Sequence, residues 1–299
     1  MMTRRLAPAA TSSRMPAVTP APMSEAEFAQ LRDFIKARFG VCFPSENAFL
    51  LERRLQPRLE ALQISTYGGY NAYLHSPELS DSERERELDE LFDRIATRET
   101  YFFREAYQLN ALRNELLPAI HERRPRGNRI SLWSAGCASG EEAYSLAMVL
   151  LESGRFGDWQ VEVVGSDYSL QALATARRGV YGQSALRQTE PLRVQRFFRT
   201  LTGRWEVTDE VRRLCRFTRS NLAAADWGAV GGPFDAIFCR NVLIYFDRLA
   251  RGPLVTRLAE RLVPGGLLFL GHSESLIDQI TPLQLKHLGG EIVYMKPVS

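Results

Sequence analysis

Apolar residues recur every three or four positions between residues 24 and 96, which is the period of an amphipathic helix. Ser24 and Glu27 have the spacing of a capping box and mark the start of the first helix, which ends at Gly40. The other helices predicted from this pattern are 49–59, 67–74 and, behind a cap at Asp81 or Ser82, 82–95. This part of the chain is therefore expected to be a small all-helical domain.

From Ile130 onward, short apolar runs of strand length alternate with helical stretches. Strands are predicted at 130–133, 161–167, 217–222, 234–239, 267–270 and 291–295. Helices are predicted at 141–151, in a stretch that ends near Ala176, and at 254–262. Strands that are separated by helices pair in parallel and are covered on both faces. The predicted fold class is α/β, with a doubly wound, mostly parallel, Rossmann-like sheet.

The remaining segments complete the predicted organisation. Residues 1–23 are rich in Pro, Ala, Ser and Thr and cannot bury enough surface to become ordered, so a disordered tail is expected there. A connecting segment is predicted at 97–127 and the sheet domain at 128–299. Within the sheet domain, about 181–216 is too long for a plain connection and contains strand-like pieces, which predicts an inserted antiparallel β-subdomain.

Composition excludes several classes of protein. The net charge of +3 is too small to argue for nucleic acid, and no apolar run approaches the roughly 18–20 residues that cross a bilayer. A cytoplasmic protein without membrane insertion is expected, acting as a monomer. The cysteines form no CxxC pair, so reduced thiols are predicted rather than disulfides, and no metal site is predicted. These cysteines are Cys42, Cys137, Cys215 and Cys239.

A bend of small residues follows the first predicted strand, at 134–140, where a doubly wound sheet binds its ligand. Ala135 and Gly136 would let a ligand approach the backbone closely. The bend lacks the GxGxxG pattern, and Glu141 and Glu142 follow it. A pyrophosphate would meet two carboxylates there, which disfavours a nicotinamide cofactor. A cationic, phosphate-free nucleoside such as S-adenosylmethionine fits the bend better.

Polar residues follow the other predicted strands at the same edge of the sheet. Asp167 ends the second strand, where a carboxylate can accept hydrogen bonds from both ribose hydroxyls. Asn221 and Leu222 follow the third strand, and an amide there could bond an adenine edge. Arg240 and Asn241 follow the fourth. All five residues are expected to surround the ligand.

Four segments together resemble the chemotaxis receptor glutamate O-methyltransferase family, the CheR type. They are TRETYFFR at 97–104, LWSAGCASGEEAYS at 132–145, RNVLIYFD at 240–247, and the stretch at 264–275 that ends in GHSES. Their order and spacing match the family, and the resemblance covers roughly residues 24–296. It implies a helical N-terminal domain, a methyltransferase domain and an inserted β-subdomain that touches the receptor.

The resemblance also implies a function. It is the transfer of a methyl group from S-adenosylmethionine to glutamate side chains in the cytoplasmic helical domains of chemoreceptors, with S-adenosylhomocysteine as the product. Arg104 would lie next to the reacting centre and Tyr245 near the methyl-transfer path, so these two are the predicted catalytic residues. By motif, the predicted cofactor contacts are Thr100, Arg104, Glu142 (with Glu141 as an alternative), Asp167, Asn221, Leu222, Arg240 and Asn241. The connecting segment at 97–127 would thus contact the cofactor.

Two features depart from the family pattern. Arg98 stands where the family often has Asn, which puts a cofactor contact from that side chain in doubt. The turn near 203–205 is short, and relatives that dock on a peptide tether of the receptor tend to have a longer one. The chain is therefore expected to act without such a tether.

Three other functions fit the sequence less well. A methyltransferase of the same fold that modifies nucleic-acid amines would show an (Asp/Asn)-Pro-Pro-(Tyr/Phe) string after the fourth strand, where this chain has RNVL at 240–243. A non-catalytic receptor-binding adaptor would be expected to lack the residues Glu142, Asp167 and Asn241, which are all present. A nicotinamide oxidoreductase is disfavoured by the two glutamates after the bend.

Overall fold

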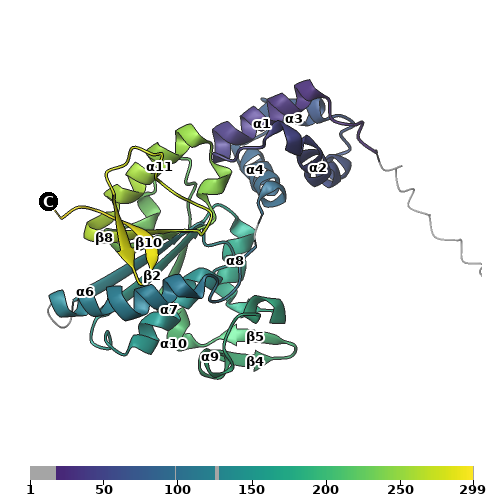
Figure 1. Cartoon of the computed structure of the whole chain (residues 1–299). Coiled ribbons are helices and arrows are strands. Elements are labelled where there is room, and N and C mark those ends of the chain that lie inside the picture. Colours follow the sequence, from purple (N-terminus) through teal and green to yellow (C-terminus); the bar gives the residue numbers. More distant parts are fainter. Residues whose placement is uncertain (1–17, 98, 125–127, 299) are drawn as a thin grey trace, which may run out of the picture.

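The computed structural model of the protein describes residues 18–97, 99–124 and 128–298. It contains a helical domain and a larger domain built on a sheet (Figure 1). Residues 1–17 of the predicted tail lie outside the described residues. No helix within the described ranges is long and apolar enough to pass through a bilayer.

The helical domain follows the predicted pattern. Its elements are α1 (Glu25–Phe39), the 3-10 turn η1 (Ser45–Asn47), α2 (Ala48–Leu62), α3 (Tyr67–His75) and α4 (Asp81–Ile95). The capping box predicted at the start of α1 is confirmed. The cap predicted for α4 at Asp81 or Ser82 is wrong by one residue, because Ser80 caps the helix and forms a second capping box with Glu83. Such a cap stabilises a helix by about 1 kcal/mol, and the apolar helix faces pack into one core.

The larger domain is built on a seven-stranded sheet in the order β6-β2-β1-β7-β8-β10-β9. The strands are β1 (Arg129–Ala135), β2 (Gln160–Asp167), β6 (Cys215–Arg219), β7 (Phe234–Cys239), β8 (Leu262–Leu270), β9 (Gln284–Leu288) and β10 (Glu291–Met295). The first five in this order are parallel, whereas β10 is antiparallel to both of its neighbours. After β1 the chain forms β2 and β6 on one side of β1, and it later forms β7 on the other side. The predicted doubly wound, mostly parallel sheet is confirmed, with its topological switch point beside β1.

Two strands are displaced from their predicted extents, and a third was not predicted. Strand β6 ends at Arg219, so Asn221 and Leu222 lie in the turn after it. Strand β8 begins at Leu262, ahead of the Pro-Gly-Gly sequence that was expected to precede it. Strand β9 was not predicted, because it lies at the sheet edge with four of its five residues exposed and therefore lacks an apolar alternation.

Helices cover both faces of the sheet. Helix α7 (Glu141–Ser153) and α8 (Leu170–Arg178) lie on one face, where the Tyr144 hydroxyl of α7 donates to the Ala176 carbonyl of α8 at 2.7 Å. Helix α11 (Arg248–Glu260) packs in a separate apolar core with β7 and β8. Short 3-10 turns η4 (Gly228–Val230) and η5 (Leu243–Tyr245) flank β7.

The predicted connecting segment is largely helical. It contains α5 (Ala106–Ala111), the π-helical turn η2 (Leu112–Leu116) and α6 (Leu117–Arg123), which follow one another without a break. The apolar side of this rod packs in the same core as α7. A π-helical turn shifts the helical period, so the apolar positions do not recur at regular spacing and the sequence pattern missed the rod.

A second, three-stranded antiparallel sheet lies in the predicted insertion. It has the order β3-β5-β4, with β3 (Val180–Tyr181), β4 (Phe198–Leu201) and β5 (Arg204–Val207). Three short helices accompany it: η3 (Gln183–Leu186), α9 (Pro191–Phe197) and α10 (Asp209–Arg212). The predicted separate β-subdomain is confirmed, and only two residues connect β4 to β5.

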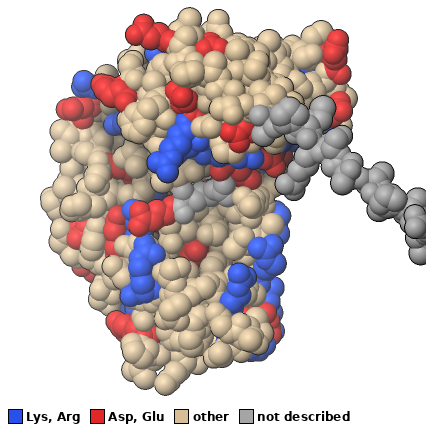
Figure 2. Space-filling model, turned by 90° about the vertical axis from the view of Figure 1, so that its right-hand side faces the viewer, with Lys and Arg blue, Asp and Glu red and all other residues tan. Residues whose placement is uncertain are grey.

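The helical domain lies against the carboxyl edge of the large sheet. Arg219, at the end of β6, forms an ion pair with Asp89 of α4. The Asn221 side-chain amide donates to the Arg38 carbonyl at 2.8 Å. Charged side chains of both signs gather along the middle of the face that Figure 2 shows, below the helical domain. The helical domain is thereby fixed beside the edge where a ligand is expected.

Candidate functional site

Two connected pockets lie beyond the carboxyl ends of β1, β2 and β7. The first, which we call the charged pocket, contains Arg104 and Glu142 and encloses about 900 Å³ including its open mouth. The second, the apolar pocket, contains Leu222 and Phe246 and encloses about 760 Å³. The residues that line both pockets are Thr97, Gly136, Ala138, Asn241 and Tyr245.

The bend between β1 and α7 forms the boundary between the two pockets. Gly136 has a φ of +80°, which suits glycine, and its amide donates to the Ser166 carbonyl at 2.8 Å. Asp167, at the end of β2, accepts hydrogen bonds from two backbone amides. Its Oδ2 accepts from Ala138 at 2.9 Å, and its Oδ1 accepts from Ser169 at 2.9 Å. Asp167 therefore holds the bend in shape and also lines the apolar pocket.

Backbone strain is concentrated around these pockets. Among the described residues, five other than glycine have positive φ, and four of them lie in or next to the pockets. These four are Phe103, Glu105, Ala138 and Asn241. The left-handed conformation costs roughly 1–2 kcal/mol per residue, so surrounding contacts must hold it. Such strain is typical of ligand sites.

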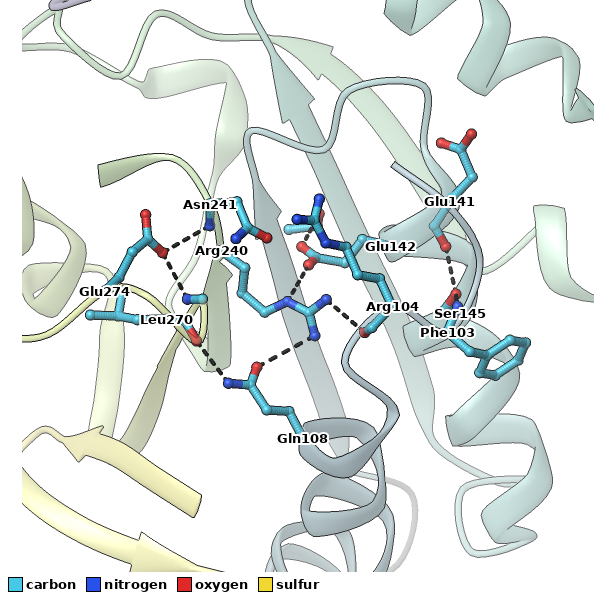
Figure 3. Close-up of polar contacts among 12 residues, drawn as sticks. Phe103, Arg104, Gln108, Glu141, Glu142, Ser145, Arg240, Asn241, Leu270 and Glu274 are labelled. Atoms are coloured by element: carbon cyan, nitrogen blue, oxygen red, sulfur yellow. Dashed lines mark hydrogen bonds and ion pairs between the residues drawn. The ribbon is translucent and has the colours of Figure 1, made fainter. Parts of the chain in front are cut away.

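Glu142 and Arg240 form a buried ion pair in the charged pocket (Figure 3). Arg240 Nε lies 2.9 Å from Glu142 Oε2, and the Ser134 hydroxyl donates to Glu142 Oε1 at 2.6 Å. Burial raises the pKa of the Glu142 carboxyl, while the positive charge of Arg240 opposes that shift. The fixed charge of Arg240 therefore favours the ionised form of the carboxylate, against the effect of burial.

The predicted pair of carboxylates after the bend is not observed as a pair. The carboxylate of Glu141 turns to the Ser139 hydroxyl, at 2.8 and 3.0 Å, and lines neither pocket. Burial raises the pKa of Glu141. The charge of Glu142 is offset by Arg240, so the electrostatic argument against phosphate was overstated. The sequence pattern shows two acidic residues after the bend, but it does not show that Arg240, at the end of β7, packs against one of them.

The segment at 99–105 carries Arg104 into the charged pocket. It is anchored on two sides, because the Phe102 amide donates to a carbonyl of the insertion at 2.9 Å and the Phe103 amide donates to Ser145 Oγ of α7 at 3.0 Å. The ring of Phe102 is fully buried against aromatic rings of the insertion. The position of Arg104 along the pocket wall is therefore well determined.

The guanidinium of Arg104 keeps most of its hydrogen-bonding capacity. Its Nη1 donates to the Glu99 carbonyl at 2.6 Å, and its carbon lies 5.8 Å from the centre of the Tyr101 ring. Within the described ranges it forms no ion pair, so the alternative of a plain surface ion pair with Glu105 is not observed. A carboxylate that enters the charged pocket could be bound by this fork.

Arg240 joins three elements, which sequence reasoning did not anticipate. Besides the contact with Glu142, its Nη2 donates to the Arg104 carbonyl at 2.7 Å and its Nη1 to Gln108 Oε1 of α5 at 3.4 Å. Gln108 in turn donates to the Leu270 carbonyl at the end of β8, at 2.7 Å (Figure 3). These contacts hold the guanidinium within the protein, and a direct cofactor contact from Arg240 stays a prediction. No sequence motif marked Gln108.

The helical domain forms one wall of the apolar pocket. Phe39 of α1 and Phe92 of α4 line it, opposite Leu222 and Phe246. The sequence analysis assigned no site residue to this domain, because its helices show only the periodicity of a core. An aromatic base would fit between these apolar walls.

Unpartnered polar groups also line the apolar pocket. Tyr168 Oη and Ser220 Oγ are buried and have no hydrogen-bond partner among the residues that the structure describes. Buried polar groups are nearly always bonded, so both atoms fit a ligand with polar edges. The Asn221 amide, in contrast, is already bonded, because its Oδ1 accepts from Ala223 at 3.0 Å and its Nδ2 donates to Arg38. Its predicted bond to adenine stays a prediction.

The predicted site residues are brought together, with one exception. All of them except Ala135 line the charged pocket, the apolar pocket or both, whereas Glu141, the alternative to Glu142, lines neither. Ala135 is the last residue of β1, and its side chain is buried in the apolar core beneath the bend. Tyr245 is half-buried and lines both pockets, with its hydroxyl 3.5 Å from the Thr97 carbonyl. Arg98 lies outside the described residues.

Two family models match adjoining parts of the chain. The model of the CheR methyltransferase all-alpha domain matches residues 26–96, and the model of the CheR methyltransferase SAM binding domain matches residues 98–289. The chain belongs to the CheR methyltransferase family. This CheR-family chain is therefore an S-adenosylmethionine-dependent methyltransferase, which confirms the predicted cofactor and enzyme class.

Named relatives of this CheR-family chain are similar over nearly their whole length. Chemotaxis protein methyltransferase 2 of Vibrio cholerae is 32% identical over 277 residues, which is 92% of this chain and 94% of the relative. The chemotaxis protein methyltransferase of Klebsiella aerogenes is 36% identical over 277 residues, covering 91% and 90%. That of Escherichia coli is 35% identical over 257 residues, covering 85% of each chain.

Proposed function

We propose that this enzyme transfers a methyl group from S-adenosylmethionine to glutamate carboxylates in the cytoplasmic helical domains of chemoreceptors, forming methyl esters. The observation that carries the proposal is the Arg104 guanidinium, which faces the charged pocket and pairs with no carboxylate of the described chain. The carboxylate of an acidic acceptor would supply an ion-pair partner for Arg104. The names of the relatives, all chemotaxis methyltransferases, support the same acceptor class.

The two pockets suit the two ends of the cofactor. The apolar pocket would hold the adenosine, with Asp167 accepting hydrogen bonds from the ribose hydroxyls. The charged pocket would hold the amino-acid end near Glu142, whose carboxylate attracts a cation. The residues shared by both pockets, including Asn241 and Tyr245, would then lie beside the junction between the two ends.

The cofactor supplies an electrophilic methyl group on a sulfonium. A glutamate acceptor is already ionised near neutral pH, since its side chain titrates near 4.3. No strong general base is therefore needed, and among the described residues no histidine lines either pocket. Arg104 would orient the acceptor carboxylate, and the anchored 99–105 segment would keep that orientation. Alignment of this kind supplies about 7–11 kcal/mol of barrier reduction.

The turn between β4 and β5 in the inserted β-subdomain indicates how the enzyme binds the receptor. Because β4 ends at Leu201 and β5 begins at Arg204, the turn between them has two residues. Relatives that use a peptide tether tend to have a longer turn. We therefore infer that this enzyme engages the receptor's helical domain without a tether.

Cofactor affinity is expected to fall as the pH falls through the pKa of Glu142. Burial raises that pKa above its ordinary value, and the charge of Arg240 opposes the shift. The carboxylate attracts a cationic ligand only when it is deprotonated, so its contribution is complete above the raised pKa and lost below it. Calorimetric titration from neutral pH down to about 5 would measure this slope. A Glu142→Gln variant that stays folded should bind more weakly and show a flatter profile; equal slopes would contradict the assignment.

The proposed reaction has a direct test. Purified enzyme is incubated with S-adenosylmethionine carrying a radiolabelled methyl group and with membranes that bear chemoreceptors. Label that appears in the receptor and is released by mild base is a carboxyl ester, as expected. Label that resists base would indicate methylation of nitrogen, and no label on any receptor would refute the proposed acceptor.

A further inference from the structure

Glu274 lies in the loop after β8 and reaches back to the end of β7. Its Oε2 accepts from the Asn241 amide at 2.8 Å and from the Gly271 amide at 2.7 Å (Figure 3). Its Oε1 accepts from the Ile244 amide at 3.1 Å. A single carboxylate therefore holds three backbone amides from two loops. Sequence reasoning assigned it no role.

The loops that Glu274 joins are fitted closely to each other. A Cβ atom at Gly271 would lie 2.8 Å from the Asn241 nitrogen and 2.9 Å from Glu274 Oε2, so only glycine leaves room for this contact. The Glu274 amide also donates to the Gly271 carbonyl at 2.9 Å, which closes the turn that returns the side chain toward β7. The carboxylate is thus held by its own backbone turn.

The amides that Glu274 binds belong to the residues around both pockets. Asn241 lines both pockets and has a φ of +58°, a conformation that other contacts must maintain. Ile244 lines the mouth of the charged pocket, where it is 46% exposed, and Tyr245 follows it. Under the proposed function, the Asn241 side of the loop would border the cofactor, and Ile244 would lie where an acceptor enters the charged pocket.

We propose that Glu274 is a positioning residue of the methyl-transfer site, whose carboxylate fixes the loop at 241–245 through three backbone amides. This proposal rests on the proposed function for its acceptor half. The oxygen that binds Asn241 orders the cofactor side of the loop, and the oxygen that binds Ile244 orders the acceptor side. A glutamine has one acceptor oxygen and one donor amide, so it can keep one half of the clamp but not both.

The test compares Glu274→Gln and Glu274→Ala in the full chain with Asp278→Asn, which removes a carboxylate from the same loop. Asp278 is exposed, its carboxylate lies 3.8 Å from the Arg248 guanidinium, and it lines neither main pocket. In Glu274→Gln we expect the affinity for S-adenosylhomocysteine to stay within about threefold of the wild type, and kcat on receptor membranes to fall about tenfold. In Glu274→Ala we expect kcat to fall as well, and the dissociation constant for S-adenosylhomocysteine should rise about tenfold or more. Asp278→Asn should match the wild type.

Amide hydrogen exchange gives a readout that needs neither acceptor nor turnover. The Ile244 amide should exchange about tenfold faster in Glu274→Gln than in the wild type, because its acceptor is replaced by a donor. Unchanged exchange in that variant, or an equal change in Asp278→Asn, would overturn the clamp. If wild-type enzyme labels no receptor, the proposed function fails, but exchange and S-adenosylhomocysteine affinity still decide the role of Glu274.

Discussion

Replacing Arg104 with alanine is expected to lower methyl transfer to receptor membranes about 100-fold or more while the protein stays folded. The side chain donates one hydrogen bond, to the Glu99 carbonyl, and forms no ion pair among the described residues. Its loss should therefore change the free energy of unfolding by less than about 1 kcal/mol. The acceptor carboxylate would lose its orienting fork, so the effect should appear in turnover.

Two further variants make this result specific. Arg187→Ala is the matched control, because Arg187 stacks 3.6 Å from the Tyr101 ring and pairs with Glu99 in the same neighbourhood but lines neither main pocket. It should keep most of the activity. Arg104→Lys retains the charge without the planar fork, so its methyl-transfer activity should lie between those of the wild type and Arg104→Ala. Wild-type turnover by Arg104→Ala would refute the assignment.

Replacing Asp167 with alanine is expected to weaken cofactor binding about 100-fold. Two hydrogen bonds from ribose hydroxyls to a carboxylate are worth about 1.5 kcal/mol each, and every 1.4 kcal/mol is about tenfold in affinity. Part of the loss would come from the bend, since Asp167 Oδ2 also accepts from the Ala138 amide. Calorimetry with S-adenosylhomocysteine would measure the change, and turnover at saturating cofactor should fall far less.

A control separates the ribose contact from a general loss of charge. Asp226 lies in the turn after β6, accepts from the Gly228 amide at 2.7 Å and lines neither main pocket. Asp226→Asn should therefore bind the cofactor like the wild type. Asp167→Asn keeps an acceptor for the bend but loses the negative charge, and should bind more tightly than Asp167→Ala. Unchanged affinity in Asp167→Ala would show that the carboxylate does not face the ribose.

Local sequence patterns predicted the elements of the fold and the edge that carries the site. The helical period from Ser24 onward predicted the helical domain, and the alternation of strands and helices predicted the doubly wound sheet. Because parallel strands end at one edge, the residues after β1, β2 and β7 were expected to meet, and they do so in the two pockets. Exceptions occurred where the period is disturbed, as at the π-helical turn η2.

The electrostatics of the site could not be predicted in the same way. Sequence alone showed the acids after the bend, but the charge that a ligand meets depends on the partner of Glu142. That partner is Arg240, 98 positions further along the chain, with its guanidinium held by Gln108. The same is true of Glu274, whose three amides lie on loops that the chain order separates.

The sequence by itself determined most of the secondary structure, the fold class and, except for Ala135, which predicted residues gather at the carboxyl edge, because apolar periodicity and strand direction are properties of short segments. Only the tertiary structure decided which charges are neutralised, that the helical domain closes the apolar pocket with Phe39 and Phe92, and that Ala135 faces the core. Those outcomes depend on distances between segments that are far apart in the chain, and such distances exist only after the elements have packed.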